Sequence, residues 1–468
     1  MMKKFHVFVF LPVTVFLMLF LQACALTAPS DAAPPKYVFL LIGDGMGPNQ
    51  IRLAREFGKL NMDVMPVRGE LQTNNVFNRT TDSAAAATAL ACGVKTYNGA
   101  IGLDRNKKPV ESSAALAKKA GCRVGLLTSV TFNHATPGAF YAHVPKRSEY
   151  AEIAAQACGA GYDLIMGYGV SVIKGETVVK DAEKAGLAVF HQDQDAFFAL
   201  NALLKPTLVF KRFGYEMDRR PDTGDSGRAL NEAVELLSVE RPAVAVRAPR
   251  YASGGVVRPL NEYAAKAIDL LYKNNPKGFF LMVEGGKIDV GAHENSTYAA
   301  MTELLEFDRA VGRALDFYRR HPEDTLIVVT ADHDTGGLML PETLPAGIAG
   351  KIRENHVRFN GRTFSFRDDE TLSSVREKLA GQGIADLTAQ ETESFEKILK
   401  SNAGNKRSHL NRNALRIADA RLGVTWTTKG HTAQNVRLFA IGRNAGLFSG
   451  VRPNSDIGRI MKSFYEKH

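Results

Sequence analysis

The chain contains little cysteine, with 4 residues among 468. Apart from Cys24, which lies in the N-terminal segment considered below, it holds Cys92, Cys122 and Cys158. An odd number argues against a full disulfide framework. Cys92 lies in a run of small residues and Cys122 just before an apolar run, so the sequence predicts buried free thiols.

The chain also lacks a comfortable membrane span near its N-terminus, because the apolar stretch there covers only Val7 to Leu21. This stretch follows two lysines and precedes small residues, which predicts an export signal over residues 1–24 and a periplasmic or extracellular location. The end of the segment, Leu21-Gln22-Ala23-Cys24, resembles a bacterial lipobox. Cys24 would then carry lipid and anchor the protein to a membrane; plain secretion without an anchor is the alternative. Residues 25–36, rich in Ala, Pro, Ser and Thr, predict a tether.

Several binding signatures are absent as well. The sequence has no internal repeat, no long low-complexity tract, no dinucleotide-binding glycine spacing and no phosphate-loop lysine. Its formal net charge is +10, or +8 without Lys3 and Lys4 of the export signal. Such a surface suits acidic partners, including phosphate compounds and anionic lipid headgroups. No basic run with interleaved aromatic residues predicts a specific nucleic-acid partner.

What the chain does contain is a set of short apolar runs separated by helical periodicity. Runs of this kind are typical of strands buried on both faces of a parallel sheet. We therefore expect an α/β fold with a doubly wound, mainly parallel sheet and helices on both of its faces, forming one domain over residues 37–468. The predicted strands are 37–42, 123–128, 278–283 and 325–330, with the sheet resuming near 435–441.

Two regions fit this alternation less well. Residues 174–259 mix short helical and extended patterns, with a loop at 219–228. Residues 340–422 are charged and poorly periodic in their middle, and predict an inserted subdomain with helices at 371–380 and 390–400.

A smooth run of small residues follows Ser83 and ends at Gly93, which predicts a short helix that starts at about Asp82. A serine at a helix N-terminus lies among unpaired backbone N–H groups, where a phosphate or a developing alkoxide is favoured. Asp and Ser are also ordinary helix caps, so the run alone leaves both interpretations open.

Oxygen and imidazole side chains follow several of the predicted strands. Parallel strands bring their carboxyl ends to one edge of the sheet, where ligands bind. Sets of His and carboxylate match zinc, whereas all-oxygen sets match magnesium. The candidate residues are Asp44, Ser83, Thr136, Glu284, Asp289, His293, Asp332, His333 and His431.

From about residue 37 to the C-terminus the sequence resembles the alkaline phosphatase family. The resemblance depends on seven motifs, which together are highly specific. They are Gly43-Asp44-Gly45-Met46-Gly47, Thr81-Asp82-Ser83-Ala84-Ala85, Gly93-Val94-Lys95-Thr96-Tyr97-Asn98-Gly99, Ala135-Thr136-Pro137, Glu284-Gly285, Thr330-Ala331-Asp332-His333 and Gly430-His431-Thr432.

The resemblance implies two Zn²⁺ ions and one Mg²⁺ ion. Asp289, His293 and His431 would hold the first zinc, and Asp44, Asp332, His333 and the Ser83 oxygen the second. Asp44, Thr136 and Glu284 would hold the magnesium. Arg147 matches the arginine that grips the phosphoryl group, and Asp82 would cap the helix and orient Arg147. Family members are often homodimers, which nothing in the patterning of this chain tests.

These residue types fit the hydrolysis of small phosphate monoesters. Metal coordination activates a serine hydroxyl, and two metals can stabilise the attacking and leaving oxygens of an in-line displacement. Ser83 would take the phosphoryl group, and hydrolysis of phosphoserine would release orthophosphate. The sequence departs from the best-known bacterial pattern at His134, where some relatives have Asp near the third metal, and at Val290, where many have a polar or aromatic residue. His134 leaves the identity of the third metal open, and Val290 the affinity for phosphate.

The alternatives are a phosphodiesterase or sulfatase of the same superfamily and a non-catalytic phosphate-binding lipoprotein. The first two usually lack the arginine and the third-site residues, and the sulfatase modification motif is absent here. The third would retain the site without using it.

Overall fold

The computed structural model describes residues 33–191, 194–210, 258–360, 365–401 and 405–466. The predicted export signal, most of the predicted tether and Cys24 lie outside these ranges, as does the predicted loop at 219–228, so these assignments stay predictions. Cys92, Cys122 and Cys158 are free, the first and last of them buried. Among the described residues, no helix is both long and apolar enough to cross a membrane.

A ten-stranded sheet forms the centre of the fold, and it confirms the predicted α/β class. Its neighbouring strands are parallel, except that β13 is antiparallel to both β8 and β2. In spatial order the strands are β14 (Gly450–Pro453), β2 (Val67–Gln72), β13 (Val436–Gly442), β8 (Thr325–Ala331), β1 (Tyr37–Gly43), β7 (Phe279–Glu284), β3 (Arg123–Thr128), β4 (Leu164–Gly167), β6 (Thr207–Phe210) and β5 (Ala188–His191).

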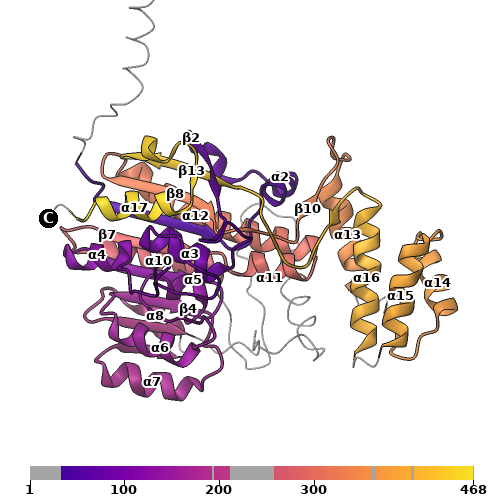
Figure 1. Cartoon of the computed structure of the whole chain (residues 1–468), viewed down its shortest axis with the longest axis horizontal. Helices are drawn as coiled ribbons and strands as arrows, with labels where there is room; N and C mark the ends of the chain where they lie inside the picture. The colour runs from indigo at the N-terminus through magenta and orange to yellow at the C-terminus, as the bar shows by residue number, and fades with distance from the viewer. Residues whose placement is uncertain (1–32, 192–193, 211–257, 361–364, 402–404, 467–468) are drawn as a thin grey trace, which may run out of the picture. The chain divides into compact units, whose positions relative to one another are not determined.

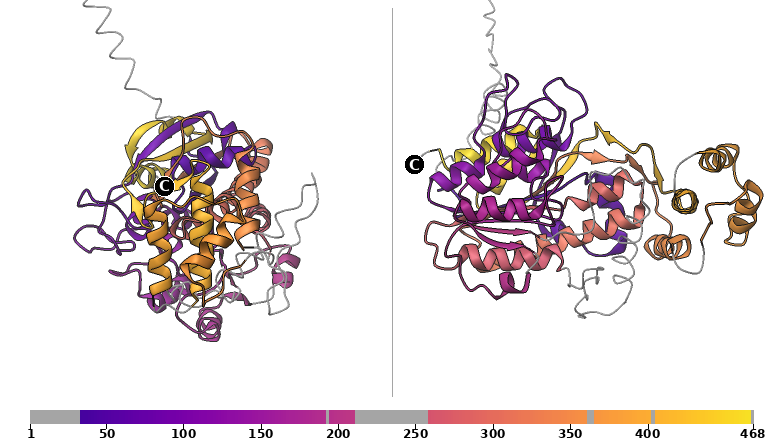
Figure 2. Two further views of the ribbon diagram at one scale, coloured as in Figure 1. Left: turned by 90° about the vertical axis from the view of Figure 1, so that its right-hand side faces the viewer. Right: turned by 90° about the horizontal axis from the view of Figure 1, so that it is seen from below.

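Helices cover both faces of this sheet (Figures 1 and 2). On one face, α10 (Leu260–Tyr272) and α12 (Thr297–Arg320) contact the central strands. On the other face lie α3 (Ser83–Cys92), α4 (Ser113–Lys119) and α5 (Ala135–Gly138), with α17 (Ser455–Ser463) packed on α3. The further helices of this part of the chain are α2 (Pro48–Phe57), α6 (Tyr150–Gly159), α7 (Gly175–Lys184), α8 (Gln194–Ala199) and α11 (Lys287–His293).

Burial on both faces explains the apolar runs of the central strands. All residues of β1, β7 and β8 are buried, and each fully buried large aliphatic side chain contributes about 1.5–3 kcal/mol. The predicted strands therefore coincide with observed ones within one or two residues.

The sheet is wider than the sequence predicts. β5 and β6 continue the parallel alternation within residues 174–259, where the sequence favoured no clear pattern. Each has only four residues, and β5 is merely half-buried, so neither carries a long apolar run. β2 and β14 lie at one edge and are largely polar or exposed, which removes the pattern of a buried strand.

Residues 348–420 form four helices beside α11 and α12, within the stretch for which the sequence predicts an inserted subdomain (Figure 1). They enclose an apolar cluster of their own, which includes Phe359, Phe366 and Phe395. We call them the helical insert: α13 (Ile348–Asn360), α14 (Leu372–Ala380), α15 (Ala389–Lys400) and α16 (Lys406–Ala420). Two short antiparallel strand pairs join the segments before and after the insert. β10 (Leu338–Met339) pairs with β11 (Thr425–Trp426), and β9 (Asp334–Thr335) pairs with β12 (His431–Thr432).

Candidate active site

Ser83 is the first residue of α3, as the sequence predicts. The Asp82 carboxylate caps the helix by accepting from the backbone N–H of Ala85 at 3.0 Å. All ten residues of α3 are buried, and their small side chains allow the helix to pack closely between its neighbours. Ser83 is 2% exposed, and its Oγ lies 3.2 Å from His333 Nε2 and 3.5 Å from Arg147 Nη1. The serine thus lies among an imidazole, a guanidinium and a helix N-terminus.

Three clusters of possible metal ligands lie beside it, and in each the ligand atoms are within 4.8 Å of one another. Their residues lie at or directly after the ends of β1, β7 and β8, on α11 and β12, and at the start of α5. The first cluster holds Asp289, His293 and His431, the second holds Asp44, Asp332 and His333, and the third holds Asp44, His134 and Glu284. Asp44 belongs to two of the three.

The first cluster is built mainly on α11. Asp289 and His293 are four residues apart on this helix, with His293 Nε2 3.2 Å from Asp289 Oδ2, and His431 Nε2 lies 3.2 Å from His293 Nε2. The Asp289 and His431 side chains are 13% and 14% exposed, whereas that of His293 is 40% exposed. The cluster is therefore open to solvent on the side of His293.

The second cluster is fully buried. Its members Asp44, Asp332 and His333 follow the central strands β1 and β8. Gly45, with φ of +70°, allows its backbone N–H to donate to Asp332 Oδ1 at 3.0 Å. A Cβ at this position would lie 2.7 Å from Asp289 Oδ1, so glycine is required where the first two clusters meet.

The electrostatics of these residues suit bound cations. Burial, reinforced by the charge of Asp332, holds the pKa of Asp44 well above its usual range, and burial also raises the pKa of Glu284. Buried polar atoms normally have hydrogen-bond partners. Within the described residues, both carboxylate oxygens of Asp44 have none, nor do Glu284 Oε1, Asp332 Oδ2, Thr136 Oγ1 and His134 Nδ1. Bound metal cations would coordinate these unpartnered oxygens and offset the repulsion between the carboxylates. The residues therefore fit the metals that the sequence predicts.

Arg147 lies beside the serine. Its Nη1 is 3.3 Å from Asp82 Oδ2, and its Nη2 is 3.0 Å from His134 Nε2. Asp82 Oδ2 also accepts from the backbone N–H of Gly99 at 3.0 Å, so the carboxylate that caps α3 also orients the guanidinium. This is the second role predicted for Asp82.

His134, a member of the third cluster, lies near enough to Asp44 and Glu284 to bind the same ion. Its pKa is lowered to about 3 by burial and by the charge of Arg147, so the ring is neutral. Arginine has only donors, and His134 Nε2 must therefore accept from it, which leaves the proton on Nδ1. Among the described residues, Nδ1 has no hydrogen-bond partner. Ligation through Nδ1 would require the other tautomer, and with it the loss of the bond from Arg147.

Two threonines that the sequence did not single out hold ligands in place. Thr335 Oγ1 donates to Asp289 Oδ1 at 2.6 Å and lies 3.1 Å from His333 Nδ1, so it joins the first cluster to the second. Thr128 donates to Glu284. Partners of this kind fix the orientation of ligands. Thr335 follows His333 by two residues, but its role depends on α11, which is distant in sequence.

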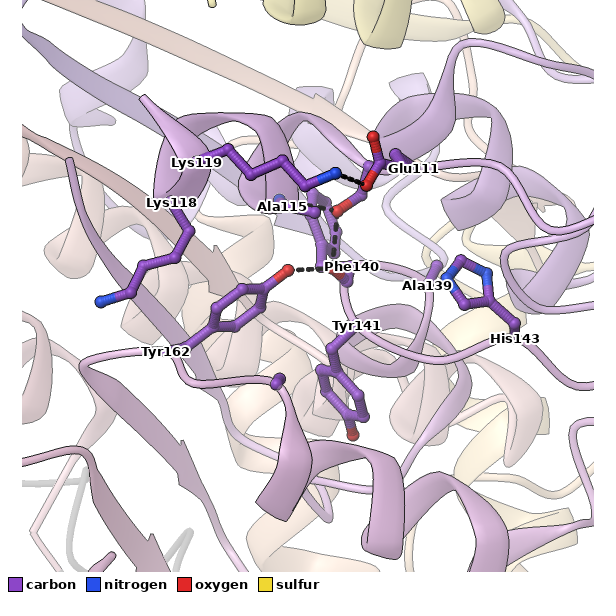
Figure 3. A pocket seen from close by; sticks show the side chains of 11 residues that line it. Glu111, Ala115, Lys118, Lys119, Ala139, Phe140, Tyr141, His143 and Tyr162 are labelled. Carbon is purple, nitrogen blue, oxygen red and sulfur yellow. Dashed lines mark hydrogen bonds and ion pairs between the residues drawn. The ribbon is translucent and has the colours of Figure 1, made fainter. Parts of the chain in front are cut away.

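Val290 lies on α11 between Asp289 and Gly291 and is half-buried. Its side chain has no polar group to offer a phosphate. A separate cavity of about 210 Å³ opens between α4 and the segments that follow α5 and α6 (Figure 3). It is lined by Glu111, Lys119 and Tyr162 among others, and by none of the predicted site residues.

Comparison with known proteins agrees with this geometry. A family model described as alkaline phosphatase matches residues 35–179 and 247–467. The chain belongs to the alkaline phosphatase family. Alkaline phosphatase 4 of Bacillus subtilis (strain 168) is 30% identical over 457 residues, which span 92% of this chain and 89% of that protein. Streptomycin-6-phosphate phosphatase of Streptomyces griseus is 34% identical over 364 residues, which span 70% of this chain and 80% of that protein.

Solved structures of the family share the fold. The cold-active alkaline phosphatase of Shewanella sp. aligns with a TM-score of 0.67 at 28% identity, over 92% of this chain and all of that one. The Thermus thermophilus alkaline phosphatase aligns with a TM-score of 0.68 at 23% identity, over 92% of both chains, and supports the fold alone. The family resemblance predicted from the motifs is thus confirmed, and the protein is a phosphomonoester hydrolase.

Proposed function

We propose that the protein hydrolyses small phosphate monoesters through a phosphoserine intermediate at Ser83. The observation that carries this mechanism is the position of the Ser83 hydroxyl, at the N-terminus of α3 and within 3.5 Å of both His333 and Arg147. Backbone N–H groups at this helix end favour the charge of a phosphoryl group. Arg147, held by Asp82, offers a planar fork to two of its nonbridging oxygens.

The reaction consists of two displacements. Ser83 Oγ attacks phosphorus as its proton is lost, and the alcohol oxygen leaves with the electrons of the P–O bond and takes up a proton. A water molecule then attacks the phosphoserine, Ser83 regains a proton and orthophosphate is released. Arg147 and the N-terminus of α3 bind the nonbridging oxygens throughout.

We assign the metals by the donor types. Asp289, His293 and His431 would hold one Zn²⁺, and Asp44, Asp332 and His333 a second, because imidazole with carboxylate is a zinc set. Asp44, Thr136 and Glu284 would hold Mg²⁺, for which oxygen donors are preferred. When bound, the ions lower the pKa of the serine hydroxyl and stabilise charge on the leaving oxygen.

A turnover assay tests the reaction. We expect an aryl phosphate monoester to be hydrolysed at alkaline pH in preference to a diester and a sulfate, with activity lost to a chelator and restored by Zn²⁺ and Mg²⁺. Faster turnover of the diester or the sulfate would favour the alternative reactions, and no turnover by metal-loaded protein would favour a binding protein.

Ser83→Ala tests the nucleophile. We expect kcat to fall by roughly 10³-fold or more, as when the nucleophile of other covalent hydrolases is removed. The matched control is Ser113→Ala, because Ser113 is also a buried first residue of a helix, α4, and its Oγ has no partner. Retention of wild-type kcat by the Ser83 variant would remove Ser83 from the mechanism.

We further propose that the protein is exported and anchored through lipid on Cys24. The supporting observations are the basic start, the apolar stretch Val7 to Leu21 and the lipobox-like residues before Cys24. The mass of the mature N-terminal peptide decides: a start other than Cys24, without added acyl mass, contradicts the anchor.

Light scattering of the purified protein tests the homodimer that the resemblance implies.

A further inference from the structure

The helical insert contacts the rest of the protein at the turn after α11, residues 294–296, and at the first residues of α12. Arg412 of α16 forms an ion pair with Glu294, with Nη1 2.8 Å from Oε2. The His356 ring of α13 stacks on Tyr298, with centroids 4.7 Å apart. These contacts begin at the residue that directly follows His293 of the first cluster.

The insert acts on this turn as a packed unit. Most of its apolar side chains form their own cluster, separate from the main core, and α13 joins the two: Ile348 and Ile352 belong to the main core and Phe359 to the cluster of the insert. Close-packed interiors transmit small displacements rather than absorb them. The position of α16 is therefore passed to Glu294 through Arg412.

The end of α11 is the part of the first cluster that packing holds least. The helix has only seven residues, too few to be stable alone. His293 stands on its last turn with its side chain 40% exposed. Among the described residues, the polar partners of the ring are Asp289 Oδ2 and, at Nδ1, the Lys429 carbonyl oxygen, beside its approach to His431. A constraint from outside the helix would thus fix its C-terminal end.

The Arg412–Glu294 pair has the geometry to supply this constraint. The two side chains are 30% and 28% exposed, so solvent and salt screen the pair less than a surface pair. A second contact orients the guanidinium, because Arg412 Nη2 lies 3.2 Å from His409 Nδ1, one turn earlier on α16. Glu294 is the C-terminal cap of α11, and its backbone is continuous with that of His293.

We propose that Arg412 and Glu294 are positioning residues for the first cluster, through which the helical insert sets how tightly the metal at Asp289, His293 and His431 is held. The inference rests on the proposed assignment of a metal to this cluster. Neither residue contacts the substrate or the reacting atoms; both act through the placement of His293.

Metal release tests the inference. Zinc-loaded protein is mixed with excess chromogenic chelator, and the release phases are recorded beside the initial zinc content. We expect Arg412→Gln and Glu294→Gln each to accelerate one phase of zinc release, that of the first cluster, by roughly tenfold, the lower end of the effect of losing a ligand-orienting partner. The other release phases should stay unchanged. Reversal of the pair, Arg412→Glu with Glu294→Arg, should restore most of the slow release.

The matched control is Lys400→Gln on α15, which removes the same charge from the insert. In the described part of the chain, Lys400 forms an ion pair with Glu396 of its own helix alone, so zinc release from this variant should equal that of the wild type. Zinc-loaded wild type with both proposed zinc sites occupied, combined with unaltered release from the Gln variants or no recovery in the reversed pair, overturns the inference alone. A wild-type protein that retains no zinc overturns the proposed metal assignment, and the inference with it.

Discussion

At the scale of single residues, Asp82 has two separate tasks. One carboxylate oxygen accepts from the Ala85 N–H and caps α3, and the other accepts from Gly99 and pairs with Arg147. The first contact stabilises the helix that carries the nucleophile. The second orients the group that binds phosphate.

Substitutions separate these tasks. Asp82→Ala should lower the free energy of unfolding by about 1 kcal/mol, because the cap is lost, and should raise KM, because Arg147 loses its anionic partner. Asp82→Asn is the matched comparison: asparagine caps as well as aspartate, so the cap should be kept. KM should still rise, because the amide NH₂ cannot accept from Gly99 or pair with Arg147 as the second oxygen does. Thermal unfolding and steady-state kinetics on one aryl phosphate check both. An unchanged KM in the Asn variant would show that Arg147 needs no charge at this position.

Much of the site could be predicted from the sequence, because its residues stand at the ends of apolar runs. Asp44, Glu284 and Asp332 each follow a buried strand, and parallel strands bring such ends together. Thr335 and Thr128 could not be predicted in this way. Thr335 matters because it donates to Asp289, and Thr128 because it donates to Glu284. Both partners are distant in sequence, and a single hydroxyl residue belongs to no spacing pattern that would reveal them.

At the scale of elements, α3 is fixed at its C-terminal end by α17. A Cβ on Gly458 of α17 would lie 2.3 Å from the Gly93 nitrogen and 2.7 Å from the Ala89 carbonyl oxygen. Both are backbone atoms, which cannot rotate away. The C-terminal helix therefore approaches the nucleophile-bearing helix at a distance that only glycine permits.

Gly458→Ala should for this reason destabilise the protein by about 1–3 kcal/mol, the range for an overpacked site, and reduce kcat as α3 moves. Gly350→Ala in α13 is the control, since a Cβ there meets nothing within 4 Å and alanine in an exposed helix stabilises by roughly 0.5–1 kcal/mol. Calorimetry gives both changes. If the two variants shifted the melting temperature alike, the close approach of α17 to α3 would have no energetic weight.

Elements were predicted where burial imposes a pattern and missed where it does not. The strands β1, β7 and β8 are buried throughout, and β3 is buried except at Arg123; all four have continuous apolar runs. The strands β4, β5 and β6 have only four residues each, and β2 and β14 are largely polar or exposed, so none of them carries a long apolar run. The helix over residues 406–420 was missed as well, because its buried face includes Asn413 and Asp419, which interrupt the apolar periodicity.

At the scale of the whole molecule, two apolar cores meet across a polar junction. Asp419 of α16 lies in this junction: it is 2% exposed and accepts from Asn355 Nδ2 of α13 at 3.1 Å. Burial raises the pKa of Asp419 to about 6, although hydrogen bonds from Thr297 and Asn355 oppose the rise. At the alkaline pH that suits the family, the junction therefore contains a buried carboxylate.

The sign of the resulting pH dependence follows from linkage. The folded pKa, about 6, exceeds the value of about 3.9 in an unfolded chain, so the folded state binds the proton more tightly. The contribution of Asp419 to stability is complete below about pH 4 and is lost as the pH rises through 6. A shift of about two pH units corresponds to about 3 kcal/mol as an upper bound.

Asp419→Asn should keep the hydrogen bond from Asn355 while remaining neutral at every pH. Compared with the wild type, we expect equal stability near pH 4 and a gain that grows between pH 5 and 7 and levels off at about 2–3 kcal/mol by pH 8. Asp386→Asn is the control, because Asp386 is exposed on the same insert and its replacement should change stability equally little at both ends of the range. Thermal unfolding of the three proteins at pH 4.5 and 8 decides the matter. If Asp419→Asn is no more stable than the wild type at pH 8, the charge of Asp419 is already compensated in the folded protein. The two cores would then meet through a fully paired polar contact, and the buried carboxylate would not lower stability.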